Sequence, residues 1–189
     1  RLDDLPPSVQ AEIKALLAAA QTKLQAGELD PAVALLERIL KLRPTHARAH
    51  FLLGQALDRK GLVREAREEF VAARDWDTMP WRPPSTAEAA LVRAARDRAA
   101  PVCDLLQAFR DASPGGVIGW ELMDDHVHPS LRGQALIAES IVNSLTNFDG
   151  PLRVPPPARN GLPPWTEYAR RLGENEYDRY GVAHRIRTL

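Results

Sequence analysis

The sequence predicts a mainly α-helical fold: two helical hairpins, followed by a partial α/β segment that is mostly helical and has at most one or two short strands. Three observations predict it. Small and apolar residues recur 34 positions apart in the first part of the chain. Residues typical of helix starts and helix ends follow the same spacing. Beyond residue 85, helical patterns alternate with a short apolar run and a glycine-containing loop.

Composition excludes several classes of protein. The chain has 189 residues, 44% of them hydrophobic, which suits one domain, or one domain plus a smaller module. Lys plus Arg total 25 and Asp plus Glu total 25, so we do not expect a general nucleic-acid binder. Cys103 is the only cysteine, which excludes an intrachain disulfide and a Cys-x-x-Cys motif. No apolar run approaches the roughly 18 residues of a membrane span, so none is expected.

The first part of the chain contains a repeat. Four pairs of similar residues lie 34 positions apart. The small ones let antiparallel helices approach closely, and the large ones fill the gap beside them. The pairs are Ala20 and Gly54, Gly27 and Gly61, Ala32 and Ala66, and Leu36 and Phe70. Predicted helix starts and ends agree with this spacing: Ser8, Gly27, Asp30 with Pro31, Thr45 and Gly61. Four helices are therefore expected.

Residues 8–75 therefore resemble two tetratricopeptide repeats, whose period is about 34 residues. The resemblance implies a concave groove that binds a peptide or protein partner. Two copies fall short of the roughly three that usually stand alone. A spacer or lid that packs on a neighbouring domain is the alternative role.

The next segment alternates between helical and irregular patterns. Residues 76–84 predict an irregular junction in which Trp76 and Trp81 form a hydrophobic seam. Ser85 and Glu88 predict a capping box for a helix that extends to about residue 99. Residues 101–105 form a short apolar run that predicts a strand, and a helix to about residue 112 follows it.

One more amphipathic helix follows the glycine-containing loop. Ser130 is expected to cap a helix over residues 131–145. Its buried face is predicted to contain Leu136, Ile137, Ile141 and Leu145. A proline-rich linker and one or two short helices are expected beyond residue 150. The predicted domains are therefore residues 1–79, 80–150 and 151–189, with no chemistry assigned to the last.

Asp125 and His128 are the residues with catalytic spacing. A carboxylate three residues before an imidazole can accept a hydrogen bond from one ring nitrogen. The other nitrogen can then take a proton from a nucleophile. A surface loop in which both side chains only cap a helix is the alternative. A metal site formed by His126, His128 and Asp124 is a further alternative, although no metal or cofactor is predicted.

The motif Asp125-x-x-His128-Pro129, followed by Gly133 and Leu136-Ile137-Ala138, resembles the last conserved block of the SGNH or GDSL hydrolases. The resemblance covers residues 85–146. It implies that Asp125 and His128 serve a serine in the hydrolysis of an ester or in acyl transfer. The chain has Ser130 where the family often has Asn, and it has no Gly-Asp-Ser or Gly-x-Ser-x-Gly block.

Because the chain begins with Arg1, we expect the serine and most of a parallel sheet to lie upstream, with the repeats inserted between the two parts of the hydrolase domain. Whether the chain belongs to an enzyme therefore stays open at this stage. A non-catalytic interaction module with a vestigial hydrolase segment is the competing hypothesis.

Overall fold

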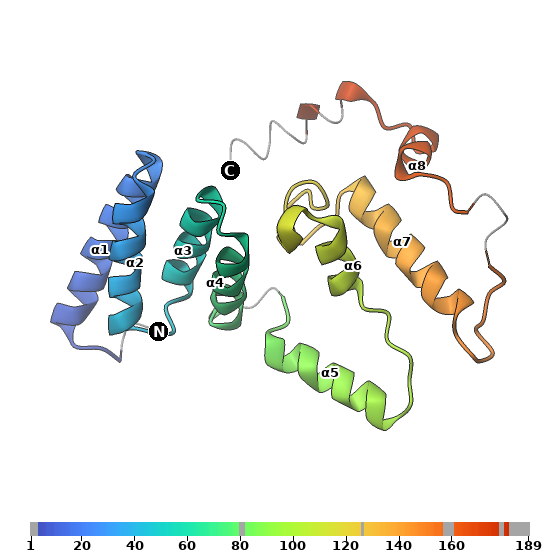
Figure 1. The fold of residues 1–189 in the computed structure, drawn as a ribbon, viewed down its shortest axis with the longest axis horizontal. Helices are drawn as coiled ribbons and strands as arrows, with labels where there is room; N and C mark the ends of the chain where they lie inside the picture. The colour runs from blue at the N-terminus through green and yellow to red at the C-terminus, as the bar shows by residue number, and fades with distance from the viewer. Residues whose placement is uncertain (1–3, 80–81, 126, 157–160, 178–179, 182–189) are drawn as a thin grey trace. The chain divides into compact units, whose positions relative to one another are not determined.

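The computed structural model describes residues 4–79, 82–125, 127–156, 161–177 and 180–181 (Figure 1). The chain forms two compact units, Arg1–Ala90 and Leu91–Leu189. The predicted domain boundaries at 79/80 and 150/151 stay predictions. The described residues are mainly helical, as predicted. Their helices are α1 (Pro7–Gln25), α2 (Leu29–Leu42), α3 (Ala47–Arg59), α4 (Val63–Asp75), α5 (Ser85–Asp97), α6 (Leu105–Ala112), the short 3-10 turn η1 (Pro114–Gly116), α7 (Leu131–Thr146) and α8 (Trp165–Arg171).

The first unit is built from two helical hairpins, α1–α2 and α3–α4, and α2 also packs on α3 (Figure 1). One hydrophobic core joins three of these helices. Every one of its members is less than a tenth exposed, so their apolar area stabilises the arrangement by its removal from water. The core residues are Ile13, Leu16, Ala20, Leu24, Ala32, Leu36, Ile39, Ala49, Leu52, Leu53 and Ala56. The predicted four-helix arrangement is confirmed.

Two of the predicted helix ends are confirmed, whereas the predicted helix starts are displaced. Helix α1 begins at Pro7 and α2 at Leu29, so Ser8 and Asp30 lie inside these helices and do not cap them. Gly27 and Gly61 each follow a helix with φ of +76°, a left-handed conformation that glycine adopts without the steric cost of a Cβ. The third helix is capped by His46 and not by Thr45. His46 Nδ1 accepts a hydrogen bond from the N–H of Ala49 at 3.1 Å. Histidine is not among the residues that usually cap helices, so the sequence pattern does not predict this cap.

The junction after α4 is organised by Arg74. Its guanidinium donates to Glu88 at 2.8 Å and to the hydroxyl of Ser85 at 2.6 Å. The N–H of Ser85 donates to Asp75 at 2.9 Å. Ser85 and Glu88 are thus used differently from the predicted capping box, because a long-range cation competes for both side chains. Trp76 is 51% exposed, and its predicted partner Trp81 lies outside the described residues, so the hydrophobic seam stays a prediction.

The second unit contains no strand within the residues that the structure describes. Residues 101–104 are irregular and α6 begins at Leu105, so the predicted strand is not formed. A strand needs a neighbour for its backbone hydrogen bonds, and the described residues supply none. One isolated antiparallel bridge joins Met123 to Pro129.

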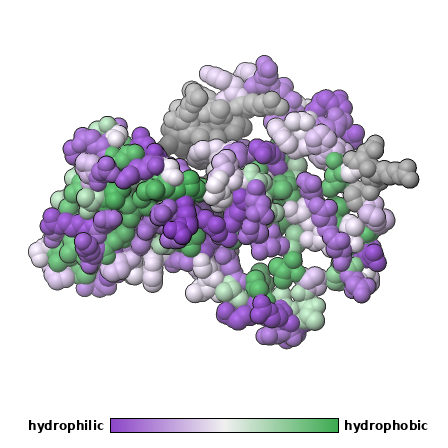
Figure 2. Space-filling model, in the orientation of Figure 1, coloured by the Kyte–Doolittle hydropathy of each residue, from purple (hydrophilic) through white to green (hydrophobic). Residues whose placement is uncertain are grey.

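Apolar burial in the second unit is limited. Gly133 is the one buried residue of α7. Of the four residues predicted for a buried face, Ile141 is 41% exposed and the others are partly buried. The prediction of a buried face is therefore wrong for Ile141. Hydrophobic side chains of this unit reach the surface in Figure 2. Its buried hydrophobic residues are Phe109, Leu122 and Ala169.

The end of the chain is described in part. Helix α8 is one of the short helices expected there, and residues 182–189 lie outside the described part. Across the described residues, none of the helices combines the length and the apolar character that spanning a bilayer requires.

Candidate functional site

The loop that contains Asp125 and His128 is closed by backbone hydrogen bonds. The N–H of Asp124 donates to the carbonyl of His128 at 2.8 Å, and the N–H of Ser130 donates to the carbonyl of Leu122 at 2.9 Å. These bonds hold the two ends of the loop together directly before α7. Asp125, Val127 and His128 therefore lie at the tip of a tight turn.

Gly133 in the first turn of α7 fixes how closely this loop lies against the helix. A Cβ at this position would lie 2.2 Å from the carbonyl oxygen of Leu122. A side chain cannot be accommodated there, because the opposing atom belongs to the backbone. Ser130 caps the helix as predicted, since its hydroxyl accepts from the N–H of Gly133 at 3.2 Å. The glycine and the cap together set where His128 stands relative to α7.

Asp125 and His128 contact each other in the predicted orientation. Asp125 Oδ2 accepts a hydrogen bond from His128 Nδ1 at 2.7 Å. Asp125 Oδ1 accepts from the backbone N–H groups of Val127 and His128, each at 2.7 Å. Three donors thus surround one carboxylate. Hydrogen bonds to the charged form, first that from Val127, hold the pKa of Asp125 well below its ordinary value.

The His128 ring is exposed and available to a partner group. Its side chain is 74% exposed. When Nδ1 donates to Asp125 in the neutral ring, Nε2 carries the lone pair that can accept a proton. Among the described residues, the ring bonds to Asp125 and to no serine hydroxyl. The pair is therefore an exposed imidazole oriented by a carboxylate.

A second carboxylate lies close to this pair. The pKa of Asp124 is raised, first because Asp124 is partly buried and then because Asp125 and Glu174 repel its charge. The charge of Glu174, which follows α8 in the chain, therefore acts on Asp124. The sequence contains no local signal for this interaction, because Glu174 is 50 positions away from Asp124.

The alternative metal site is only partly described. His126 lies outside the described residues. In the part of the chain that the structure describes, no group of three His, Cys, Asp or Glu side chains is arranged to hold a metal ion.

A separate candidate surface lies on the first unit, where α1 and α3 present exposed side chains. Phe51 is 40% exposed, and the guanidinium of Arg48 lies 5.8 Å from the centre of its ring. Phe51 also packs on Phe70 of α4, with ring centroids 5.9 Å apart. Arg59 donates from α3 to the carbonyl of Leu24 on α1 at 2.8 Å, which ties the two helices together at one end.

Comparison with known proteins assigns the helical hairpins to a class. Residues 17–80 match the family model of the tetratricopeptide repeat, about a third of the chain. This segment is a helical repeat of the kind that serves as a protein-interaction module. The match does not extend to the Asp125–His128 loop. No curated protein and no solved structure matches the chain.

Proposed function

We propose that the chain is a protein-interaction module whose helical hairpins bind an acidic, partly apolar peptide segment on the exposed sides of α1 and α3. The observation that carries this proposal is the combination of an exposed aromatic ring with three cations on α1 and α3, whose carboxylates are Glu12, paired with Arg38, and Asp58. The match of residues 17–80 to the tetratricopeptide repeat supports a protein partner.

Helical periodicity groups the side chains on each of these surfaces. Residues three or four positions apart lie on the same side of a helix. On α1 this groups Lys14, Leu17 and Gln21, and on α3 it groups Arg48, Phe51, Gln55 and Arg59. We call these seven residues the α1–α3 surface. It contains three cationic side chains and no carboxylate, so it favours a partner that has acidic groups. Phe51 supplies an apolar contact of the kind that anchors many interfaces.

Binding of defined peptides tests this proposal. The probes are a fluorescein-labelled peptide of alternating Glu and Leu and one of alternating Lys and Leu, compared by fluorescence anisotropy. We expect the acidic peptide to bind and the basic peptide not to bind. Affinity for the acidic peptide should fall with salt, because exposed charges are screened.

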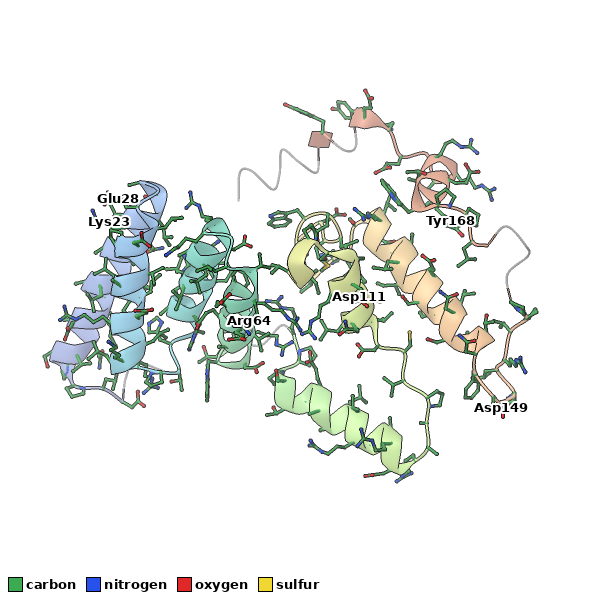
Figure 3. All side chains as sticks on the ribbon, in the orientation of Figure 1. Lys23, Glu28, Arg64, Asp111, Asp149 and Tyr168 are labelled. Carbon is green, nitrogen blue, oxygen red and sulfur yellow. The ribbon has the colours of Figure 1, made fainter. Side chains whose placement is uncertain are left out.

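Variants of two arginines locate the interaction. Arg48→Glu should weaken binding of the acidic peptide by about tenfold or more, because it replaces an attraction with a repulsion. Arg64→Glu is the matched control, since Arg64 lies on α4 with a side chain that is 84% exposed (Figure 3). Equal effects of the two substitutions would contradict a site on the α1–α3 surface.

A second candidate function is suggested by the 2.7 Å hydrogen bond between Asp125 and His128. In this hypothesis His128 is the general base of an ester hydrolysis or acyl transfer, and Asp125 orients it. The attacking hydroxyl would come from a serine outside residues 1–189. The resemblance of residues 85–146 to the hydrolase block supports this assignment.

The natural full-length protein is the sample for testing the second candidate. Hydrolysis of a short-chain aryl ester is measured for that protein and for its His128→Ala variant. We expect the substitution to lower the rate by about a thousandfold or more. His46→Asn, which alters a histidine of the first unit, should leave the rate unchanged. An unaltered rate in His128→Ala would show that His128 is not the base.

A further inference from the structure

A cavity of about 350 Å³ lies between α7 and α8 in the second unit. Cavities of roughly 300 to 1,000 Å³ are typical of small-molecule sites. Helix α7 forms one wall and α8, on which Figure 3 labels Tyr168, forms another, while residues 162–164 add to the lining. The walls of this α7–α8 cavity include Ala135, Ala138, Glu139, Trp165, Tyr168 and Ala169.

Helical spacing places two aromatic rings together at this cavity. Trp165, Tyr168 and Ala169 lie three or four positions apart, so they share one side of α8, and all three line the cavity. On α7, Ala135 and Ala138 share a side in the same way and project little beyond the helix backbone. Small side chains opposite two large rings leave room for a ligand in contact with the rings.

Glu139 gives the cavity a negative charge. Among the described residues that line the cavity, it is the one carboxylate, and none of them is Lys or Arg. It lies four positions after Ala135 and therefore on the same side of α7. Within the part of the chain that the structure describes, its carboxylate forms no ion pair and no hydrogen bond. The charge is therefore available to a cationic ligand.

The cationic side chains of α8 lie away from the cavity. Arg170 and Arg171 pair with Glu167, with nitrogen–oxygen distances of 2.9 Å and 2.8 Å. None of these three residues lines the cavity. The rotation of about 100° per residue places them on the opposite side of α8 from Trp165 and Tyr168. The charged side chain that a ligand in the cavity meets is therefore that of Glu139.

Two aromatic rings and one carboxylate together favour an organic cation. The face of an aromatic ring is electronegative and attracts a cation, and Trp is the strongest of the aromatic residues in this role. A quaternary ammonium ion has no N–H group, so it needs no hydrogen-bond acceptor. Its methyl groups gain from leaving water. The cavity supplies both requirements, an apolar and aromatic surface and an opposite charge.

We propose that the α7–α8 cavity binds a small quaternary ammonium ion, with its charge attracted by Glu139 and its methyl groups in contact with Trp165 and Tyr168. The proposal goes beyond both candidate functions, because it depends neither on the α1–α3 surface nor on His128. The ligand is a free cation and not the phosphocholine head group of a lipid, since Glu139 would repel the phosphate of the latter.

Titration of the 189-residue chain with choline chloride at constant ionic strength tests the proposal. The readout is the indole N–H signal of Trp165 in 1H–15N correlation spectra, assigned by its loss in Trp165→Phe. We expect a saturable shift of this signal. The uncharged isostere of choline, 3,3-dimethyl-1-butanol, should bind about tenfold or more weakly, because it keeps the shape and lacks the charge. Equal affinities of the two compounds would overturn the proposal.

A charge variant and a second ligand test the role of Glu139. Glu139→Gln should weaken choline binding about fivefold or more, because it removes the opposite charge and keeps the shape of the side chain. Glu37→Gln on α2 changes an exposed carboxylate of the first unit in the same way and should have no effect. Phosphocholine should bind more weakly than choline to the unaltered chain. Phosphocholine binding as tight as that of choline would overturn the assignment to a free cation.

Two variants of Tyr168 test the contribution of the aromatic rings. Tyr168→Phe keeps the ring and should retain choline binding. Tyr168→Leu keeps an apolar side chain without the ring and should weaken binding about tenfold. Circular dichroism checks that each variant retains its helix content. Choline binding that is unchanged in both Glu139→Gln and Tyr168→Leu would place the ion elsewhere on the chain and overturn the proposal.

Discussion

Gly54 of α3 and Phe70 of α4 pack so closely that a Cβ on Gly54 would lie 2.6 Å from Cε1 of Phe70. The corresponding residues of the first hairpin are Ala20 and Leu36, and both are fully buried. Each hairpin thus combines one small and one large residue. The larger side chain, Phe70, is paired with the smaller residue, Gly54. The two pairs are different solutions to the same spacing between antiparallel helices.

The first prediction concerns this pair. Gly54→Ala should lower the free energy of unfolding by about 1–3 kcal/mol, because the added methyl group overpacks the contact with Phe70. Urea denaturation followed by circular dichroism measures the loss. Gly54→Ala combined with Phe70→Leu reproduces the pair of the first hairpin. The double variant should be less destabilised than the sum of the two single variants, and strict additivity would show that the residues do not compete for space.

The second prediction concerns the tautomer of His128. At pH 8 the neutral ring should have its proton on Nδ1, because Asp125 accepts from that nitrogen. In Asp125→Asn an amide N–H can donate to Nδ1, so the population with the proton on Nε2 should rise. Two-bond 1H–15N correlation spectra distinguish the tautomers. Asp124→Asn is the control and should leave the ring unchanged; a wild-type ring protonated mainly on Nε2 would contradict the assigned hydrogen bond.

The third prediction is a pH dependence of the first unit. The pKa of His46 is lowered from 6.5, first by burial and then by the charges of His50 and Arg43. The neutral ring is also the form that caps α3. A lowered pKa in the folded state means that this stabilisation is complete above pH 6.5 and is lost as the pH falls through the folded-state value.

His46→Ser isolates that contribution. Serine keeps a capping oxygen and has no charge to titrate, so the stability of this variant should decrease less between pH 7 and pH 5 than that of the wild type. The difference should be about 1 kcal/mol, the usual worth of a helix cap. Urea denaturation at several pH values provides the measurement. Parallel pH profiles for the two proteins would rule out the role assigned to His46.

The fourth prediction concerns Glu167 on α8. Hydrogen bonds first from Arg170 and then from Arg171 lower its pKa from 4.5 to about 2. The interaction should therefore be present above pH 4.5 and be lost as the pH approaches 2. Arg170→Ala should raise the pKa toward 4.5, as followed by carboxyl 13C chemical shifts. Arg132→Ala should not change it, and an ordinary Glu167 pKa in the wild type would refute the paired geometry.

Several features of the fold and site follow from local spacing. The repeat of 34 residues predicts which small and large residues face each other, as Gly54 and Phe70 do. The spacing of three between Asp125 and His128 predicts their hydrogen bond, because a tight turn brings such residues together. The capping role of Ser130 is equally local.

Other features depend on residues far apart in the chain. Arg74 donates hydrogen bonds to Ser85 and Glu88, which are 11 and 14 positions away, and these bonds replace the predicted capping box. The strand expected at residues 101–105 does not form, because the described residues provide no neighbouring strand. The α7–α8 cavity combines residues from Leu131 to Leu172, which no local pattern relates.

Periodicity and short motifs specify helices, their caps and a turn, since those depend on backbone hydrogen bonds and side chains within a few positions of one another. Three-dimensional packing determines which charges compete, which apolar surfaces are covered and where an empty space remains. Those outcomes depend on distances between segments that are remote in the chain, and burial changes the energy of each charge and apolar group that they bring together.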